Sequence, residues 1–122
     1  MYQVRGYEDR MPLVYAAADL MMTRAGAATI AELATVGMPA LIVPWPGAAE
    51  NHQVENAREL SEHHGAVLIE EADLTADRVV GRLTELMSNP SALAEMSSSA
   101  SALGARHRSG ALVDLIERVA TA

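Results

Sequence analysis

The chain has 122 residues, half of them hydrophobic, which is enough for one domain with a single core. Its net charge is -7 and it contains no Lys and no basic cluster, which argues against a nucleic-acid partner. Cysteine is absent, which excludes disulfides and thiolate metal sites, and no apolar run reaches the ~18 residues of a membrane span or resembles a signal peptide. We therefore expect a soluble, cytoplasmic domain.

Short apolar runs alternate with helical patterns along the first half of the chain. We predict strands at 20–23, 40–43 and 66–69, and helices at 10–18, 27–36 and 50–64. From residue 74 onward the pattern is helical, with helices at 75–87, 91–103 and 110–119 and breaks near Asn89-Pro90 and Gly104. This order predicts an α/β fold over residues 1–122, with a Rossmann-like parallel sheet and helices on both faces.

The beginning of the chain is short for this fold. A complete domain of this kind starts with a strand, a glycine-rich turn and a helix, whereas only Tyr2-Gln3-Val4 precedes the first predicted helix. We therefore expect a truncated N-terminus.

A turn of small residues, from Arg24 to Thr29, joins the first strand to the next helix. In that helix Ile30, Leu33 and Ala34 share one face. Small side chains would allow an anion to approach the first N–H groups of the helix, where the helix dipole favours negative charge. The turn is thus a candidate diphosphate site, although an ordinary strand-to-helix turn has the same local sequence.

Glu32 lies one helical turn after Ala28, away from the apolar face. A carboxylate at this place can accept two hydrogen bonds from the diol of a ribose, as acidic residues do in dinucleotide-binding folds. The alternative is a solvated acidic residue that the helix dipole stabilises.

The next strand ends in a loop that we expect to border the site. Gly37 ends the helix and Pro39 prevents its continuation, and an unalternating apolar run follows, which is typical of a buried parallel strand. The segment 44–47 then forms a loop at the carboxyl end of the strand, where open α/β sheets bind ligands. Trp45, the only Trp, lines the site or covers the sheet edge, and the sequence favours neither.

Three neutral polar residues share a face at the start of the following helix: His52, Gln53 and Asn56. Amides and imidazole can both donate and accept hydrogen bonds to sugar hydroxyls without the desolvation cost of a full charge. The alternative is a solvated helix start.

The remaining histidines do not predict a metal site. Adjacent residues on a helix point about 100° apart, so His63 and His64 make a poor pair of ligands.

Together these segments resemble the donor-binding half of the MurG family, the UDP-N-acetylglucosamine transferases of bacterial peptidoglycan synthesis. The likeness covers nearly the whole chain. The matching segments are Tyr15-Ala16-Ala17-Ala18-Asp19, Arg24-Ala25-Gly26-Ala27-Ala28-Thr29, Ala31-Glu32-Leu33, Gly37-Met38-Pro39-Ala40, Val43-Pro44, His52-Gln53 and Asn56-Ala57. The resemblance implies the C-terminal half of a GT-B fold of glycosyltransferase family 28.

The resemblance also assigns roles to individual residues. It implies that the turn binds the donor diphosphate, that Glu32 binds the ribose, and that polar residues of the following helix contact the sugar. The implied turn residues are Gly26, Ala27, Ala28 and Thr29, and the implied sugar contacts are His52, Gln53 and Asn56.

Two positions depart from the family pattern. Gly47 stands where the family often has a histidine, so a contact made by that imidazole is lost or made elsewhere. Segment 6–11 resembles a loop whose backbone meets uracil, and Glu8 stands there in place of the usual aliphatic residue. Glu8 is therefore a candidate contact to the base through its backbone.

The implied reaction is inverting transfer of N-acetylglucosamine from UDP-GlcNAc to undecaprenyl-pyrophosphoryl-MurNAc-pentapeptide, which converts lipid I to lipid II. It needs no cofactor and no metal, because helix-end N–H groups would stabilise the departing UDP. The family's other domain carries the lipid acceptor site, the membrane-facing patch and the catalytic base. We therefore expect this chain alone to be inactive, and the parent protein to lie on the cytoplasmic face of the cell membrane.

Two other functions fit the same residues. One is another GT-B transferase or epimerase with a different UDP-sugar, since fold does not fix the substrate. The other is a stand-alone, non-catalytic donor-binding subunit that completes its site with a partner chain.

Overall fold

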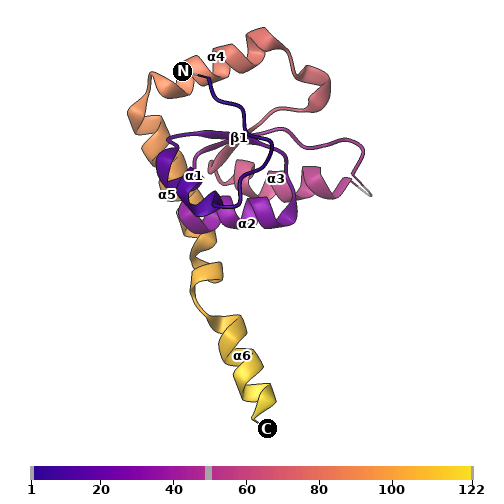
Figure 1. Cartoon of the computed structure of the whole chain (residues 1–122), viewed down its shortest axis with the longest axis vertical. Helices are drawn as coiled ribbons and strands as arrows, with labels where there is room; N and C mark the ends of the chain where they lie inside the picture. The colour runs from indigo at the N-terminus through magenta and orange to yellow at the C-terminus, as the bar shows by residue number, and fades with distance from the viewer. Residues whose placement is uncertain (1, 49–50, 122) are drawn as a thin grey trace.

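The structure, a computed structural model, describes residues 2–48 and 51–121 and contains a parallel sheet between helices (Figure 1). The strands are β1 (Met21–Thr23), β2 (Ala40–Ile42) and β3 (Ala66–Leu68), in the spatial order β1-β2-β3. The helices are α1 (Met11–Ala17), α2 (Ala27–Val36), α3 (His52–Glu62), the 3-10 helix η2 (Glu71–Asp73), α4 (Ala76–Met87), α5 (Pro90–Arg108) and α6 (Ala111–Ala120). The α/β fold with a parallel sheet predicted from the sequence is confirmed.

Both faces of the sheet are covered by helices. Alternate residues of a strand point to opposite faces, and the residues of β2 are buried on both of them. On one face Ala40 and Ile42 of β2 pack with Leu33 of α2 and Leu60 of α3. On the other face Leu41 packs with residues of α4 and of the first half of α5, among them Leu86 and Met96. All three residues of β2 are buried, as expected for a central parallel strand.

The end of α2 is fixed by a left-handed glycine. Gly37 has φ 69°, and the N–H groups of Gly37 and Met38 donate to the carbonyls of Ala34 and Leu33 at 3.3 and 2.9 Å. These are the two bonds of a Schellman motif, so the predicted helix stop at Gly37 is confirmed with its physical reason. The chain then turns directly into β2.

The predicted break at Gly104 is wrong. Helix α5 continues through this position to Arg108, and Gly104 is buried against α2. A Cβ atom at position 104 would lie 2.1 Å from the carbonyl oxygen of Ala34, so the missing side chain allows the two helix backbones to approach closely. Close packing of α5 on α2 therefore explains this glycine, and the helix ends later, before the left-handed Gly110.

The other helix boundaries agree with the sequence within a few residues. Helix α3 begins at His52 among the described residues, while the predicted start at Glu50 lies outside them. Thr75 accepts a hydrogen bond from the N–H of Arg78 at 3.3 Å and caps α4.

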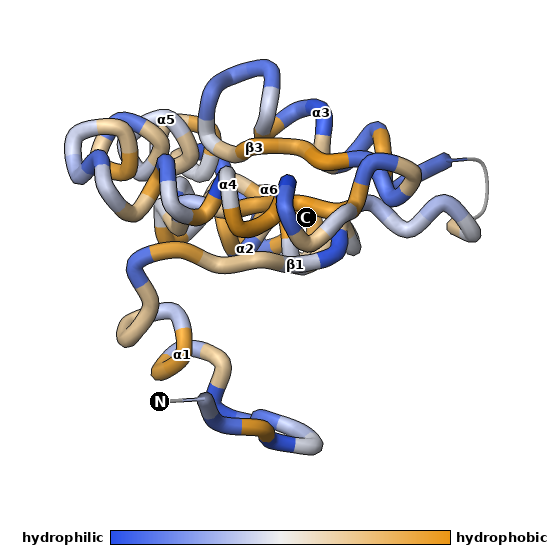
Figure 2. Tube along the Cα trace, turned by 90° about the horizontal axis from the view of Figure 1, so that it is seen from above, coloured by the Kyte–Doolittle hydropathy of each residue, from blue (hydrophilic) through white to orange (hydrophobic). Residues whose placement is uncertain are grey.

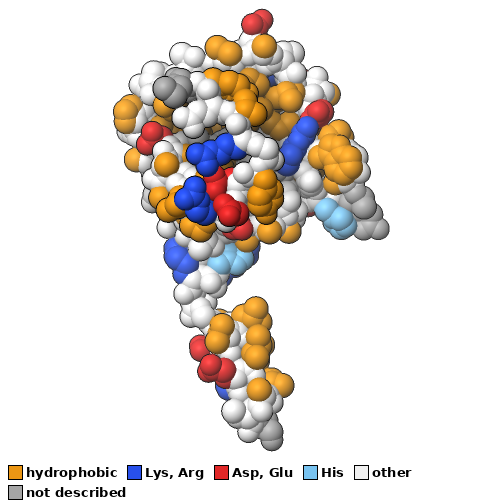
Figure 3. Space-filling view, viewed as in Figure 1, with side chains coloured by type: hydrophobic (Ala, Val, Ile, Leu, Met, Phe, Trp, Pro, Cys, Tyr) orange, Lys and Arg blue, Asp and Glu red, His pale blue; other side chains and the backbone are white. Residues whose placement is uncertain are grey.

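The two ends of the chain extend away from the sheet. Figure 2 shows the N-terminal segment and α1 beside the β1 edge of the sheet, on the side opposite to β3. Helix α6 projects from the body with apolar side chains on its surface (Figures 1 and 3). Its exposed apolar residues are Leu112, Val113, Leu115, Ile116 and Val119.

Two glycines inside helices allow a matched test of this packing. We expect Gly104→Ala to lower the free energy of unfolding by about 1–3 kcal/mol, because the new methyl group overlaps the Ala34 carbonyl. Gly81→Ala in α4 should instead raise it by about 0.5–1 kcal/mol, because the added Cβ would meet no atom within 4 Å apart from the neighbouring backbone of its own helix. Chemical denaturation of both variants measures the difference, and stabilisation by Gly104→Ala would contradict the packing described here.

Candidate functional site

The site is built at the carboxyl edge of the sheet, where the segment after β1 leads into α2. Gly26 precedes the helix with φ -61° and ψ 143°, and it provides no side-chain cap. The first helical hydrogen bond runs from the N–H of Ile30 to the Gly26 carbonyl at 3.0 Å. The N–H groups of Ala27, Ala28 and Thr29 come before that bond and form the positive end of the helix dipole.

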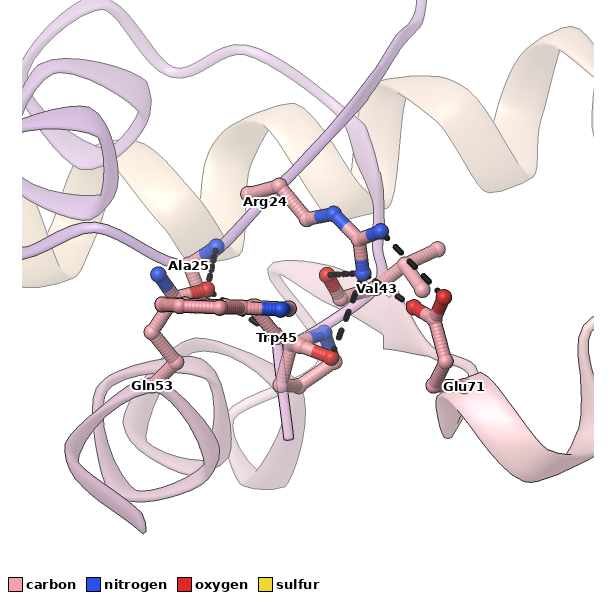
Figure 4. Close-up of polar contacts among 7 residues, drawn as sticks. Arg24, Ala25, Val43, Trp45, Gln53 and Glu71 are labelled. Carbon is pink, nitrogen blue, oxygen red and sulfur yellow. Dashed lines mark hydrogen bonds and ion pairs between the residues drawn. The ribbon is translucent and has the colours of Figure 1, made fainter. Parts of the chain in front are cut away.

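Two side-chain amides of α3 hold the residue in front of this helix end. The Oε1 atom of Gln53 accepts hydrogen bonds from the N–H of Ala25 at 3.1 Å and from the N–H of Trp45 at 2.9 Å (Figure 4). The Nδ2 atom of Asn56 donates to the carbonyl of Ala25 at 3.0 Å. We call these contacts of Gln53 and Asn56 with Ala25 and Trp45 the amide clamp.

The amide clamp also determines which atom of each side-chain amide is left outside it. Because two backbone N–H groups donate to Gln53, its oxygen must face them and its NH2 group takes no part in the clamp. Asn56 uses its NH2 group, so its Oδ1 atom is the one left out of the clamp. One amide donor and one amide acceptor thus remain outside the clamp.

Ala25 itself is completely buried. Both of its peptide groups are bonded to side chains and not to a neighbouring strand, which satisfies them at a point where the sheet ladder has ended. The direction in which the chain enters α2 thus depends on α3.

Trp45 lies on the rim of the site. Its side chain is 53% exposed, and its indole ring extends toward Ala25 and Gln53 and away from Glu71 (Figure 4). A Cβ atom at position 47 would lie 2.6 Å from the ring, so the absence of a side chain at Gly47 makes room for the indole.

Arg24 connects the ends of all three strands. Its guanidinium donates to the carbonyls of Val43 and Pro44 after β2, at 3.3 and 3.4 Å, and forms an ion pair with Glu71 after β3 (Figure 4). The hydrogen bond from Arg24 lowers the pKa of the Glu71 carboxyl group, so this pair stays charged at neutral pH. Arg24 therefore holds together the loops that follow the three strands.

Glu32 is held by a residue of α1. The hydroxyl of Tyr15 donates to Oε2 of Glu32 at 2.7 Å, and the Tyr15 ring is buried in the core. Burial, followed by the hydrogen bond and the negative charge of Glu32, raises the pKa of Tyr15 to about 12.

The structure brings most of the predicted site residues to one edge of the sheet. Gly26, Ala27, Ala28 and Thr29 form the start of α2, Gln53 and Asn56 hold it from α3, and Glu32 lies one turn further along α2. His52 is exposed at the start of α3.

Glu8 is bonded within its own loop. It accepts hydrogen bonds from the Arg5 side chain at 2.7 Å and from the N–H of Arg10 at 3.0 Å. Its carboxylate thus serves the segment before α1, and a contact of its backbone with uracil stays a prediction.

The sequence analysis missed three sets of contacts. These are the Tyr15–Glu32 hydrogen bond, the bonds of Arg24 to the loops after β2 and β3, and the use of both amides to hold Ala25. Tyr15 and Arg24 do stand in segments that match the family, but their spacing from Glu32 and Glu71 gives no local signal. Only the packing of helices and loops far apart in the sequence places these partners together.

Neither a metal cluster nor a membrane span is found in the described ranges. Residues 2–48 and 51–121 contain no group of three or more His, Asp or Glu side chains arranged to hold a metal ion. Over the same residues no helix has the length and apolar character needed to cross a bilayer.

Comparison with known proteins adds the following similarities. Residues 1–112 match the family described as glycosyltransferase family 28 C-terminal domain. A protein of Acidothermus cellulolyticus named UDP-N-acetylglucosamine--N-acetylmuramyl-(pentapeptide) pyrophosphoryl-undecaprenol N-acetylglucosamine transferase is 46% identical over 121 residues, covering 99% of this chain and 32% of that protein. A protein of the same name from Clavibacter sepedonicus is 42% identical over 115 residues, covering 94% of this chain and 31% of that protein.

A solved structure shows the same arrangement. The crystal structure of Acinetobacter baumannii MurG superposes with a TM-score of 0.77 at 33% sequence identity, and the match covers 95% of this chain and 35% of that one. The chain thus spans about a third of the length of the proteins that it matches.

The amide clamp predicts different changes in stability for two similar amide-to-carboxylate substitutions. Gln53→Glu keeps an oxygen that can accept from both N–H groups, so the free energy of unfolding should stay within about 0.5 kcal/mol of the original. Asn56→Asp places a carboxylate against the Ala25 carbonyl and should cost about 1–3 kcal/mol. Denaturation at neutral pH measures both, and equal losses would contradict the assigned orientations.

The raised pKa of Tyr15 predicts a pH-dependent contribution to stability. The phenol must keep its proton to donate to Glu32, so the contribution is complete below the ordinary tyrosine pKa of about 10. It is lost as the pH rises through the folded-state pKa of about 12. The difference in unfolding free energy between the original chain and Tyr15→Phe, measured against pH, should therefore shrink over this range, and a constant difference would disprove the linkage.

Proposed function

Because the chain belongs to the family of glycosyltransferase family 28 C-terminal domains, we propose that it is the donor-binding domain of a UDP-N-acetylglucosamine transferase of peptidoglycan synthesis. The enzyme would transfer N-acetylglucosamine to an undecaprenyl-pyrophosphoryl-MurNAc-pentapeptide. The observation that carries the proposal is the uncapped start of α2, held open by the amide clamp at the carboxyl edge of a parallel sheet.

The start of α2 supports binding of the diphosphate. Its first N–H groups belong to Ala27, Ala28 and Thr29, and small side chains before and among them allow phosphate oxygens to approach. Amide dipoles at a helix N-terminus bind phosphate in this way in many nucleotide sites. A fixed set of donors needs no reorganisation when charge develops on the departing UDP, so the same groups would stabilise the leaving group during transfer.

The two ends of the donor would extend from this point along different elements. The ribose would reach Glu32, one turn along α2, whose carboxylate accepts hydrogen bonds from hydroxyl groups. The sugar would lie toward α3, where the amide of Gln53 donates, Oδ1 of Asn56 accepts and His52 stands nearby at the helix start.

The chemistry of transfer would be a direct displacement at the anomeric carbon with inversion. The acceptor hydroxyl attacks, the bond between the anomeric carbon and the diphosphate oxygen breaks, and a base takes the hydroxyl proton. In this proposal the base, the lipid acceptor site and the contact with the membrane belong to the part of the enzyme that this chain does not contain, and the reaction would take place on the cytoplasmic side.

Donor binding tests the proposal. The folded chain should bind UDP-GlcNAc and UDP in calorimetric titrations, and Glu32→Ala should weaken both about 10- to 150-fold, because a hydrogen bond to a carboxylate contributes about 1.5–3 kcal/mol. Glu95→Ala, which removes an exposed carboxylate from α5, is the matched control and should bind as the original does.

Two results would speak against this function. Failure of the folded chain to bind either nucleotide would remove the donor-site assignment. Tighter binding of UDP-glucose than of UDP-GlcNAc would instead point to a transferase with another donor sugar.

A further inference from the structure

We propose that Tyr15 is a positioning residue that fixes the carboxylate of Glu32 for recognition of the donor's ribose hydroxyl groups. This inference rests on the proposed donor-binding function. It adds a residue of α1, whereas the other residues of the proposed site lie on α2 and α3 and in the turn before α2. Tyr15 itself would not touch the nucleotide.

Tyr15 is held in place by its surroundings. Its side chain is 8% exposed and packs in the core cluster with Ile30 and Leu33, the buried face of α2. The ring therefore has one orientation, and its hydroxyl group is presented to Glu32 at a fixed point. The hydrogen bond of 2.7 Å to Oε2 joins residues 17 positions apart, so it is made by tertiary packing and not by helix geometry.

Glu32 has a flexible side chain on the exposed face of α2. A glutamate on an exposed helix face loses side-chain conformational entropy when a ligand immobilises it. The bond from Tyr15 selects one orientation before any ligand arrives, so less entropy is lost on binding. Because an ionised carboxylate has about four lone-pair positions, the bond to Oε2 leaves capacity for both hydroxyl groups of a ribose.

Tyr15 and Glu32 both line a cavity. This cavity of about 300 Å³ between α1, α2 and His107 of α5 is lined mainly by apolar atoms, and Glu32 is the only carboxylate among the described residues that line it. Met11, Pro12 and Tyr15 form its α1 side. A hydroxyl group that enters this cavity thus meets the carboxylate of Glu32 with its Oε2 atom held by Tyr15.

The raised pKa of Tyr15 agrees with this role. At about 12 it keeps the phenol protonated, and hence a hydrogen-bond donor to Glu32, at neutral pH.

A purely structural role for the bond, as a tie between α1 and α2, predicts a different result. Loss of a tie weakens every ligand of the domain equally, whereas loss of a positioning contact weakens only ligands that use Glu32. The distinction requires a nucleotide without the ribose diol.

The experiment titrates the chain with UDP and with 2′,3′-dideoxy-UDP, before and after Tyr15→Phe. This substitution keeps the buried ring and removes only the hydroxyl. We expect the affinity for UDP to fall about 3- to 10-fold, and the affinity for the dideoxy nucleotide to change less than about twofold. Tyr2→Phe, at a tyrosine that is 90% exposed, is the matched control and should change neither affinity.

A double substitution gives a second readout. In the Glu32→Ala background, Tyr15→Phe should have no further effect on UDP affinity, because the residue through which it acts has been removed. Equal losses for both nucleotides, an unchanged UDP affinity, or full additivity in the double variant would each overturn the inference. Absence of UDP binding by the original chain would overturn the proposed function as well, which separates the two failures.

Discussion

The geometry of the site depends on the hydrogen bonds that α3 makes to Ala25 and Trp45. Ala25 is buried just beyond the end of β1, where no strand is available to satisfy its peptide groups. Gln53 and Asn56 bond to its N–H and its carbonyl in place of a neighbouring strand, and Gln53 also holds the loop after β2 through Trp45. These bonds set the direction of the chain as it enters α2, and with it the direction of the first N–H groups of that helix, which are proposed to bind the donor diphosphate.

Other parts of the site are held by similar long-range contacts. Arg24 joins the segments that follow the three strands, and Tyr15 bonds to Glu32 from a helix that precedes the sheet. Gly104 allows α5 to pack closely against α2, the helix that starts at the turn of small residues and carries Glu32. The groups proposed to bind the donor are therefore held by partners from α1, α3 and α5, which favours a site whose donors and acceptors are in place before the ligand binds.

The sequence predicted the elements well because its strands and helices have strong patterns. The apolar run of β2 and the glycine stop of α2 are local signals, and both were confirmed. Gly104 was misread as a helix break, since the local cost of a glycine says nothing about a neighbouring backbone that excludes a side chain. For the site, residue types and spacing predicted Gln53 and Asn56 as ligand contacts, but their bonds to Ala25 depend on how α3 packs and were not predictable from spacing.

Hydrogen exchange of backbone amides, followed by NMR, tests the central claim most directly. If Gln53 holds the turn, the N–H groups of Ala25 and Trp45 are protected in the free chain, while those of Ala27 and Ala28 exchange quickly and become protected when UDP is added. Fast exchange at Ala25 and Trp45 in the free chain, or UDP-induced protection that leaves Ala27 and Ala28 unchanged, would contradict an amide clamp that presents the start of α2 to the donor diphosphate.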